Sequence, residues 1–132
     1  MAVNYSSGAK TARMQAVLDL INAGSGTPKL KIRDASNNIL VTIPMDSTSA
    51  GTVGGDPAAI TFDCTPALSA AASAGSPTTA TNAIMTDVAD ATIVSGLTVG
   101  VGTGNIQLDA VSITAGQTVT ITAGTITHAA DT

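Results

Sequence analysis

The sequence predicts an all-β protein, an antiparallel β-sandwich of the jelly-roll type with one N-terminal α-helix. Two observations carry this prediction. Beyond Pro28 the chain of 132 residues breaks into short apolar–polar alternations separated by Gly, Asn, Asp and Pro, the pattern of antiparallel strands. Only the segment before Pro28 has apolar residues at helical spacing. Because strand–helix–strand repeats are missing, a parallel α/β fold is not expected.

The helix is expected from Gly8 to Ala23. One face of this segment carries four apolar residues at the i, i+3, i+4, i+7 spacing, namely Met14, Val17, Leu18 and Ile21. Ser6 or Ser7 can cap the start, and Gly24 suits a left-handed helix end. We therefore expect an N-terminal arm and helix over residues 1–27 and a β-sandwich domain over residues 28–132.

The first expected hairpin runs from Lys29 to Ile43, with turn residues between its two strands. Leu30 and Ile32 alternate with three basic residues that share one face, Lys29, Lys31 and Arg33. This face has two interpretations. It is either a solvated face that also guards against edge pairing, or a salt-bridging surface for an acidic partner.

Further strands are expected at 58–63 (with Ile60 and Phe62 inward), 79–86, 91–95, 106–108, 110–114, 117–122 and 124–127. We expect a loop at 45–57, a turn at 87–90 and a glycine-rich connection at 96–104. The Ala/Ser-rich segment 65–79 fits a loop or a short helix. The tetrapeptide Ile-Thr-Ala-Gly occurs at 113–116 and 121–124. It indicates two neighbouring strands ended by Ala-Gly turns; a short β-helix or fibre module is the alternative fold.

The composition excludes several classes of protein. A net charge of −4 with five Lys and Arg leaves no basic face for nucleic acid, and 2% aromatic residues leave no base-stacking platform. No apolar stretch is long enough to span a membrane, and the N-terminus lacks the order of a signal peptide. We therefore expect the protein to be intracellular, or to be located wherever an assembled particle containing it goes. A single Cys forms neither an internal disulfide nor a Cys-based zinc site.

The candidate chemical sites each have a simpler structural interpretation. Asp87 and Asp90 could touch Ca²⁺, but turn capping is the plainer role, since calcium loops bring many oxygen ligands. Segment 96–104 could cradle phosphate, but no helix is expected after it. Cys64 could act as a nucleophile with His128, but a buried structural thiol is the simpler assignment. We therefore expect no catalytic, cofactor-binding or metal site and no enzyme; a hydrolase with an Asp-only site is the rival.

Four segments of the chain, taken in order, resemble a known class of protein. They are Ala9–Val17, Leu30–Ala35, Ile93–Gly100 and Ile106–Ile121. In order and composition these segments resemble small virion structural proteins of tailed bacteriophages, most closely capsid decoration (cement) proteins. The resemblance covers most of the chain, although the Ala/Ser tract 65–79 has no counterpart. It carries no functional residues over.

The resemblance implies a β-rich module on the virion capsid surface, made in the host cytoplasm. Its partners would be the major capsid protein and further copies of itself as a dimer or trimer. The alternatives are a tail, baseplate or fibre component, and a β-sandwich adhesion or carbohydrate-binding module. From the residues themselves we expect the N-terminal arm and helix and the long loops 45–57 and 65–79 to contact the shell, more than the sheet faces do. The arm and helix would contribute Tyr5, Lys10, Arg13, Met14, Val17, Leu18 and Ile21. The competing interpretation is that the apolar stripe of the helix faces the core.

Overall fold

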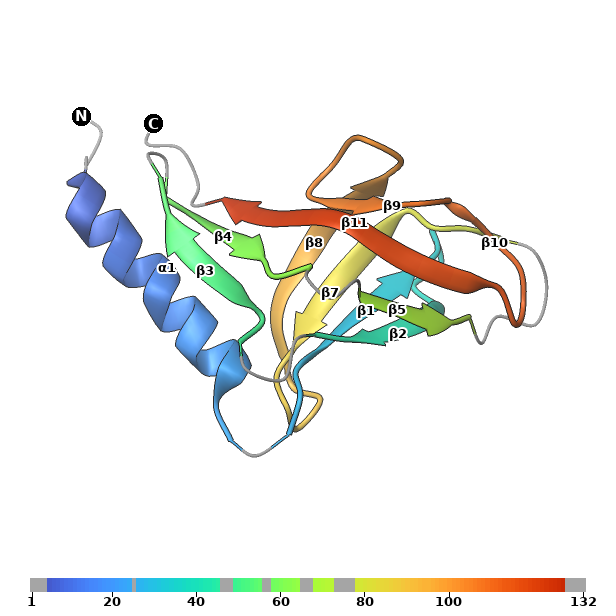
Figure 1. Cartoon of the computed structure of the whole chain (residues 1–132), viewed down its shortest axis with the longest axis horizontal. Helices are drawn as coiled ribbons and strands as arrows, with labels where there is room; N and C mark the ends of the chain where they lie inside the picture. Colours follow the sequence, from blue (N-terminus) through green and yellow to red (C-terminus); the bar gives the residue numbers. More distant parts are fainter. Residues whose placement is uncertain are drawn as a thin grey trace.

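The computed structural model describes residues 5–24, 26–45, 49–55, 58–64, 68–72 and 78–127. In this part of the chain one helix precedes a series of strands (Figure 1). The elements are α1 (Ser7–Asn22), β1 (Lys29–Arg33), β2 (Ile39–Pro44), β3 (Gly51–Gly54), β4 (Ala59–Phe62), β5 (Leu68–Ala71), β6 (Thr78–Thr79), β7 (Asn82–Thr86), β8 (Thr92–Gly100), β9 (Ile106–Leu108), β10 (Ser112–Ile113) and β11 (Thr118–Thr127). The predicted all-β class with one N-terminal helix is confirmed.

The strands form one strongly curled sheet, where the sequence analysis expected two facing sheets (Figure 1). Among the described residues, nine strands belong to it in the order β2-β1-β7-β8-β9-β11-β4-β3, with β5 also paired to β11. β10 and β6 form a separate two-stranded piece. The pairs are antiparallel except β8 with β9, which run parallel. The expected hairpins β1–β2 and β7–β8 are both present.

β11 is the reason why the sheet is continuous. Residues Thr118–Ile121 of this strand pair with β5, and Thr125–Thr127 pair with β4. β9 pairs with β11 across a register shift between Ile121 and Ala123. The extra residue there, Thr122, donates its hydroxyl to the Gln107 carbonyl oxygen at 3.1 Å. A bulge bends and twists a strand without ending it. The expected break between two strands is therefore a bulge within one strand, and Ala123–Gly124 is not a turn.

β8 is also longer than predicted. Its pairing with β7 skips one residue between Leu97 and Val94, and Gly96 adopts a φ of +74° there. Glycine takes this conformation without steric cost, so the strand passes through a bulge and continues to Gly100. The expected glycine-rich connection is thus shorter, spanning residues 101–105.

Helix α1 packs on the sheet at the edge formed by β3 and β4, with further contacts to β8. Ser6 caps its start, because its hydroxyl accepts a hydrogen bond from the Ala9 N–H at 3.1 Å. Met14, Leu18 and Ile21 point into the core that the sheet encloses. The helix and the sheet therefore share one hydrophobic core.

The core is built from aliphatic side chains, and Phe62 is its one ring among the described residues. The largest fully buried side chains come from the helix, from six strands of the sheet (β1, β2, β4, β7, β9 and β11) and from β10: Ile21, Leu30, Ile32, Leu40, Val41, Ile43, Ile60, Met85, Ile106, Leu108, Ile113 and Ile121. Ile60 and Phe62 of β4 point inward as predicted. A curled sheet can be filled by such medium-sized residues without large aromatic anchors.

Two strands lie in segments where none was expected, and a third lies partly in one. β3 falls within the expected loop 45–57 and β5 within the expected loop or helix 65–79, whereas β6 ends that segment and shares only Thr79 with the expected strand 79–86. Each has a partner distant in sequence: β3 pairs with β4, β5 with β11, and β6 with β10. Weak local patterns become strands when a neighbour supplies the hydrogen bonds. Residues 46–48, 56–57, 65–67 and 73–77 lie outside the described part.

Candidate functional site

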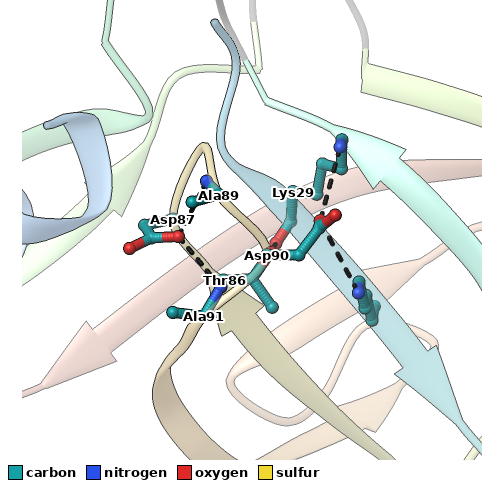
Figure 2. A network of polar contacts seen from close by, with 7 residues as sticks. Lys29, Thr86, Asp87, Ala89, Asp90 and Ala91 are labelled. Carbon is teal, nitrogen blue, oxygen red and sulfur yellow. Dashed lines mark hydrogen bonds and ion pairs between the residues drawn. The ribbon is translucent and has the colours of Figure 1, made fainter. Parts of the chain in front are cut away.

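The basic residues of β1 lie in a row on the outer side of the sheet. Lys29 Nζ donates to Asp90 Oδ1 at 3.3 Å, and Lys31 Nζ lies 3.6 Å from the same oxygen (Figure 2). Arg33 Nε donates to Asn82 Oδ1 at 2.9 Å. These cations therefore have partners within the chain. Since β1 lies between β2 and β7, the expectation that this face guards an exposed edge is wrong.

The carboxylate of Asp90 is held by two ammonium groups at an exposed position. The hydrogen bond from Lys29, followed by the charges of Lys29 and Lys31, lowers the pKa of Asp90 below its ordinary value. Asp90 also has a φ of +66°, a left-handed conformation that Asp tolerates in turns. The cluster thus joins the β7–β8 turn to β1. An exposed pair of this kind contributes little to stability.

Asp87 closes the β7–β8 turn through its side chain. Its Oδ1 accepts hydrogen bonds from the Ala89 and Ala91 N–H groups, both at 2.9 Å (Figure 2). This is the predicted turn-capping role, and it is confirmed. Nothing supports the calcium interpretation: in the described ranges, no three His, Cys, Asp or Glu side chains are placed to hold a metal ion.

Asp34 has the same role in the β1–β2 turn. Its Oδ1 accepts from the Ser36 N–H at 2.9 Å and the Asn38 N–H at 3.0 Å, and these hydrogen bonds lower the pKa of Asp34. A shallow hollow of about 340 Å³ lies beside this turn, lined by Asp34, Ala35, Ser36, Thr78, Thr79 and Thr81. The one carboxylate lining it is already engaged in the turn.

The residues of the expected helix interface separate into buried and exposed groups. Met14, Leu18 and Ile21 are buried in the core, and Val17 is half-buried against it. The expectation that these side chains dock on a partner is therefore corrected in favour of the core-facing interpretation, because β3 and β4 already cover them. The stripe completes the sheet's own core.

The remaining three residues of that interface lie nearer the solvent. Lys10 is half-buried, whereas Tyr5 and Arg13 are exposed. The guanidinium carbon of Arg13 lies 4.8 Å from the centre of the Tyr5 ring, which is cation–π geometry. The arm is thus joined to the helix at this point, and both side chains remain accessible.

The glycine-rich segment does not have the architecture of a phosphate cradle. A strand, β9, follows it, so no helix begins directly after the loop as a phosphate cradle requires. The loop is instead closed by Asn105. Its Oδ1 accepts from the Thr98 N–H and the Thr98 hydroxyl, both at 3.0 Å, and its N–H donates to the Thr98 Oγ1 at 2.9 Å. Neither Thr98 nor Asn105 was predicted from the sequence, where the available signal was an Asn directly after a Gly.

Cys64 follows β4 and packs partly buried against the core. Burial, and secondarily the negative charge of Asp63, raise the pKa of this thiol. A raised pKa opposes the thiolate form that a nucleophile needs. This agrees with the structural-thiol interpretation. His128, its expected catalytic partner, lies outside the described residues.

Asp109 and Asn22 tie strands together and were not predicted. Asp109 Oδ1 accepts from the Thr120 N–H at 3.0 Å, joining the end of β9 to β11. The Asn22 side chain donates to Ser49 Oγ at 3.1 Å and accepts from the Ala50 N–H at 3.0 Å, fixing the helix end to the segment before β3. Both contacts join residues that are distant in sequence, so no local sequence pattern predicts them.

Comparison with known proteins gives no relative: no protein-family model, no curated protein and no solved structure matches this chain. In the described part of the chain, no helix has the length and apolar character needed to cross a membrane.

Proposed function

We propose that this chain is a structural protein of a tailed-bacteriophage particle, and specifically a capsid decoration protein. It would bind the outer surface of the shell formed by the major capsid protein and stabilise that shell. Its role would be non-enzymatic, and it would act as a homo-oligomer on the virion surface. The resemblance of four ordered segments to such virion proteins supports this assignment.

The observation that carries the proposal is the use of the polar side chains. The carboxylates of Asp34, Asp87 and Asp109 accept hydrogen bonds from backbone N–H groups, and Asp90 pairs with β1. Each of these side chains closes a turn or joins two strands. A catalytic site needs polar groups that converge on a shared space and keep hydrogen-bonding capacity for a substrate. Here the polar groups maintain the shape of a surface, which suits a protein that acts by covering another protein.

Several large apolar side chains are also available for contacts with other molecules. Tyr5, Leu20, Ile39 and Val101 are each exposed by more than two-fifths of their surface: 47%, 57%, 45% and 57%. Apolar groups of this size gain most when a partner covers them. They are spread over the arm, the helix, β2 and the connection between β8 and β9, so that contacts on more than one side of the molecule would cover them.

The copy number of the chain in purified particles tests the proposal. Quantitative mass spectrometry would compare this chain with the major capsid protein of particles from the phage that encodes it. We expect on the order of hundreds of copies, in a fixed ratio to the capsid protein. A handful of copies would assign the chain to the tail, baseplate or fibre instead. Absence from particles, together with binding on a glycan array, would favour the adhesion module.

A second measurement tests the shell-stabilising role directly. Particles that lack the chain are mixed with purified protein and heated, and release of their DNA is followed with an intercalating dye. A decoration protein that stabilises the shell raises the temperature of DNA release in proportion to the bound protein. An unchanged release temperature at saturating bound protein would contradict this role.

A further inference from the structure

Helix α1 lies at the margin of the molecule beside β3, so one side of it faces the sheet and the other faces away (Figure 1). Met14, Leu18 and Ile21 on the first side are buried in the core. On the opposite side, six exposed residues fall within about 60° of Ala16 around a helix of 3.6 residues per turn. We call them the outer helix face: Ala12, Arg13, Ala16, Asp19, Leu20 and Ala23.

The outer helix face is unusually apolar for a surface that nothing in the described part of the chain buries. Three of its residues are Ala, and Leu20 is 57% exposed. A surface helix normally carries polar side chains opposite its core side, whereas a helix that is apolar all round is covered all round. The composition of this face therefore indicates a contact with another molecule.

The two charges of this face indicate what that molecule is. Arg13 lies three residues before Ala16, and Asp19 lies three residues after it. In two antiparallel copies of α1 related by a two-fold axis at Ala16, residues equally far before and after Ala16 lie level with one another. Arg13 is then level with the partner subunit's Asp19, and the same pairing occurs a second time by symmetry. A face that is complementary to itself in this way is what a two-fold homodimer requires.

The apolar residues fit the same arrangement. Ala12 and Leu20 lie four residues before and four residues after Ala16, so Leu20 is level with the partner subunit's Ala12. A large side chain thus meets a small one on each side of the axis. Ala16 at the crossing point allows the helix axes to approach to about 8 Å, the close end of helix packing. Parallel helices would instead place Arg13 beside a second arginine and Leu20 beside a second leucine.

Both charged side chains keep hydrogen-bonding capacity for this contact. The Arg13 guanidinium stacks on the Tyr5 ring at 4.8 Å, which leaves its N–H donors in the plane of the group. Asp19 Oδ1 accepts from Gln15 Nε2 at 2.9 Å, and a carboxylate has a second oxygen for further bonds. These contacts within the chain restrict the two side chains, which lowers the entropy that they lose on association.

We propose that two copies of this chain associate through the outer helix face, as an antiparallel pair of α1 helices about a two-fold axis at Ala16. The inference rests on the homo-oligomeric part of the proposed function, for which it names the contact surface and the partner. It also uses the side of the helix that the core does not, so the buried stripe and the dimer contact occupy opposite sides of one element.

A charge-exchange experiment on the purified full-length protein tests the pairing. Sedimentation equilibrium up to about 100 µM should show wild type passing from the 12.9 kDa monomer to a dimer of twice that mass. Arg13→Asp and Asp19→Arg each give the face two charges of one sign, so each should dimerise about tenfold more weakly or worse. An equal mixture of the two variants should dimerise again, because every introduced charge then faces an opposite one. A merely structural role of either residue would not produce this recovery.

Leu20→Ser tests the apolar contact, and Val101→Ser is the matched control. Both residues are 57% exposed, but Val101 lies between β8 and β9, outside the outer helix face. We expect Leu20→Ser to weaken the dimer by about tenfold or more, since two leucines lose their contacts. Val101→Ser should stay within about twofold of wild type. Far-ultraviolet circular dichroism should give the wild-type spectrum for every variant, because all the substituted side chains are exposed.

The outcomes separate this pairing from the decoration function. A monomeric wild type at about 100 µM overturns the pairing, and so does a dimer that keeps its strength in Arg13→Asp and Asp19→Arg. A mixture of these variants that stays monomeric refutes the antiparallel arrangement. None of these measurements uses particles, so a dimer that is absent from particles refutes decoration alone. A monomer that binds the shell refutes the pairing alone.

Discussion

The contact between Gly124 and Phe62 gives the sharpest test of this fold. Gly124 lies in β11, in the segment that the sequence analysis placed at a turn. A Cβ at this position would overlap Phe62 Cδ2 and would lie 2.6 Å from Cε2 and 2.9 Å from Cγ. Ordinary carbon–carbon contacts are about 3.5–4.0 Å. The ring of Phe62 therefore packs directly against the β11 backbone. In Gly124→Ala the added methyl group would overlap the atoms of this ring.

The cost of this substitution follows from how little the ring can move. Phe62 is only 5% exposed, so its neighbours confine it. Overpacking a confined core site costs about 1–3 kcal/mol. Because several ring atoms are overlapped, we expect Gly124→Ala to lower the free energy of unfolding by about 2–3 kcal/mol. For a domain of this length, that corresponds to a fall in melting temperature of roughly 6–12 °C.

Gly54→Ala is the matched control, because Gly54 is also a strand glycine. A Cβ there meets nothing within 4 Å, and its φ is not positive. We expect this variant to be neutral or more stable by up to about 0.5 kcal/mol, since Ala loses less backbone entropy than Gly on folding. Urea unfolding followed by far-ultraviolet circular dichroism measures both variants; the chain has no Trp for a fluorescence assay.

A double-mutant cycle with Phe62→Ala identifies the cause of the loss. Removing the ring alone should cost about 3–5 kcal/mol through the cavity it leaves. In that background the methyl of Gly124→Ala fills empty space, so its own cost should fall by at least about 1 kcal/mol. A Gly124→Ala variant within about 0.5 kcal/mol of wild type, or strictly additive losses in the cycle, would refute the contact.

Three further predictions concern the helix, a turn and the thiol. Ile21→Ala should lower the free energy of unfolding by about 2–4 kcal/mol in thermal circular dichroism, because Ile21 is fully buried; no loss would place the helix stripe outside the core. The Asn38 and Ser36 hydrogen bonds hold the pKa of Asp34 below its ordinary 3.8, so their stabilisation is present above about pH 4 and is lost as pH falls further. Asp34→Ala should therefore lower the urea midpoint more at about pH 6 than at about pH 2; an equal effect at both would contradict this. Because burial raises the pKa of Cys64, iodoacetamide at about pH 8 should alkylate the folded protein several-fold more slowly than the urea-unfolded protein, and equal rates would argue against burial.

The elements that the sequence predicted correctly are those with strong local patterns. The alternation of Leu30 and Ile32 with basic residues correctly predicted β1. The helical spacing of Met14, Leu18 and Ile21 correctly predicted α1. The β7–β8 turn was equally predictable from the sequence, because the Asp87 side chain can accept hydrogen bonds from the N–H groups of its own turn. Patterns of this kind act over a few residues and need no distant partner.

The strands that were missed depend on partners far along the chain. The segment Leu68–Ala71 has the composition of a loop or an Ala helix, yet it becomes β5 because β11 offers unpaired backbone groups beside it. The same holds for β3 beside β4. Conversely, Gly124 suggested a turn, but its lack of a side chain allows Phe62 to pack directly against β11. A glycine required for close approach and a glycine required for a turn look identical in the sequence.

By itself, the sequence determined an all-β class, an N-terminal helix with one apolar face, and turns closed by Asp side chains. Each of these follows from interactions between residues close in sequence. The tertiary structure alone decided that the strands form one curled sheet, because a bulge at Thr122 lets β11 bend and continue between β5, β9 and β4. It also decided that the helix stripe is core and that Val101 is exposed. Burial depends on which surfaces the rest of the chain covers, and local periodicity carries no information about that.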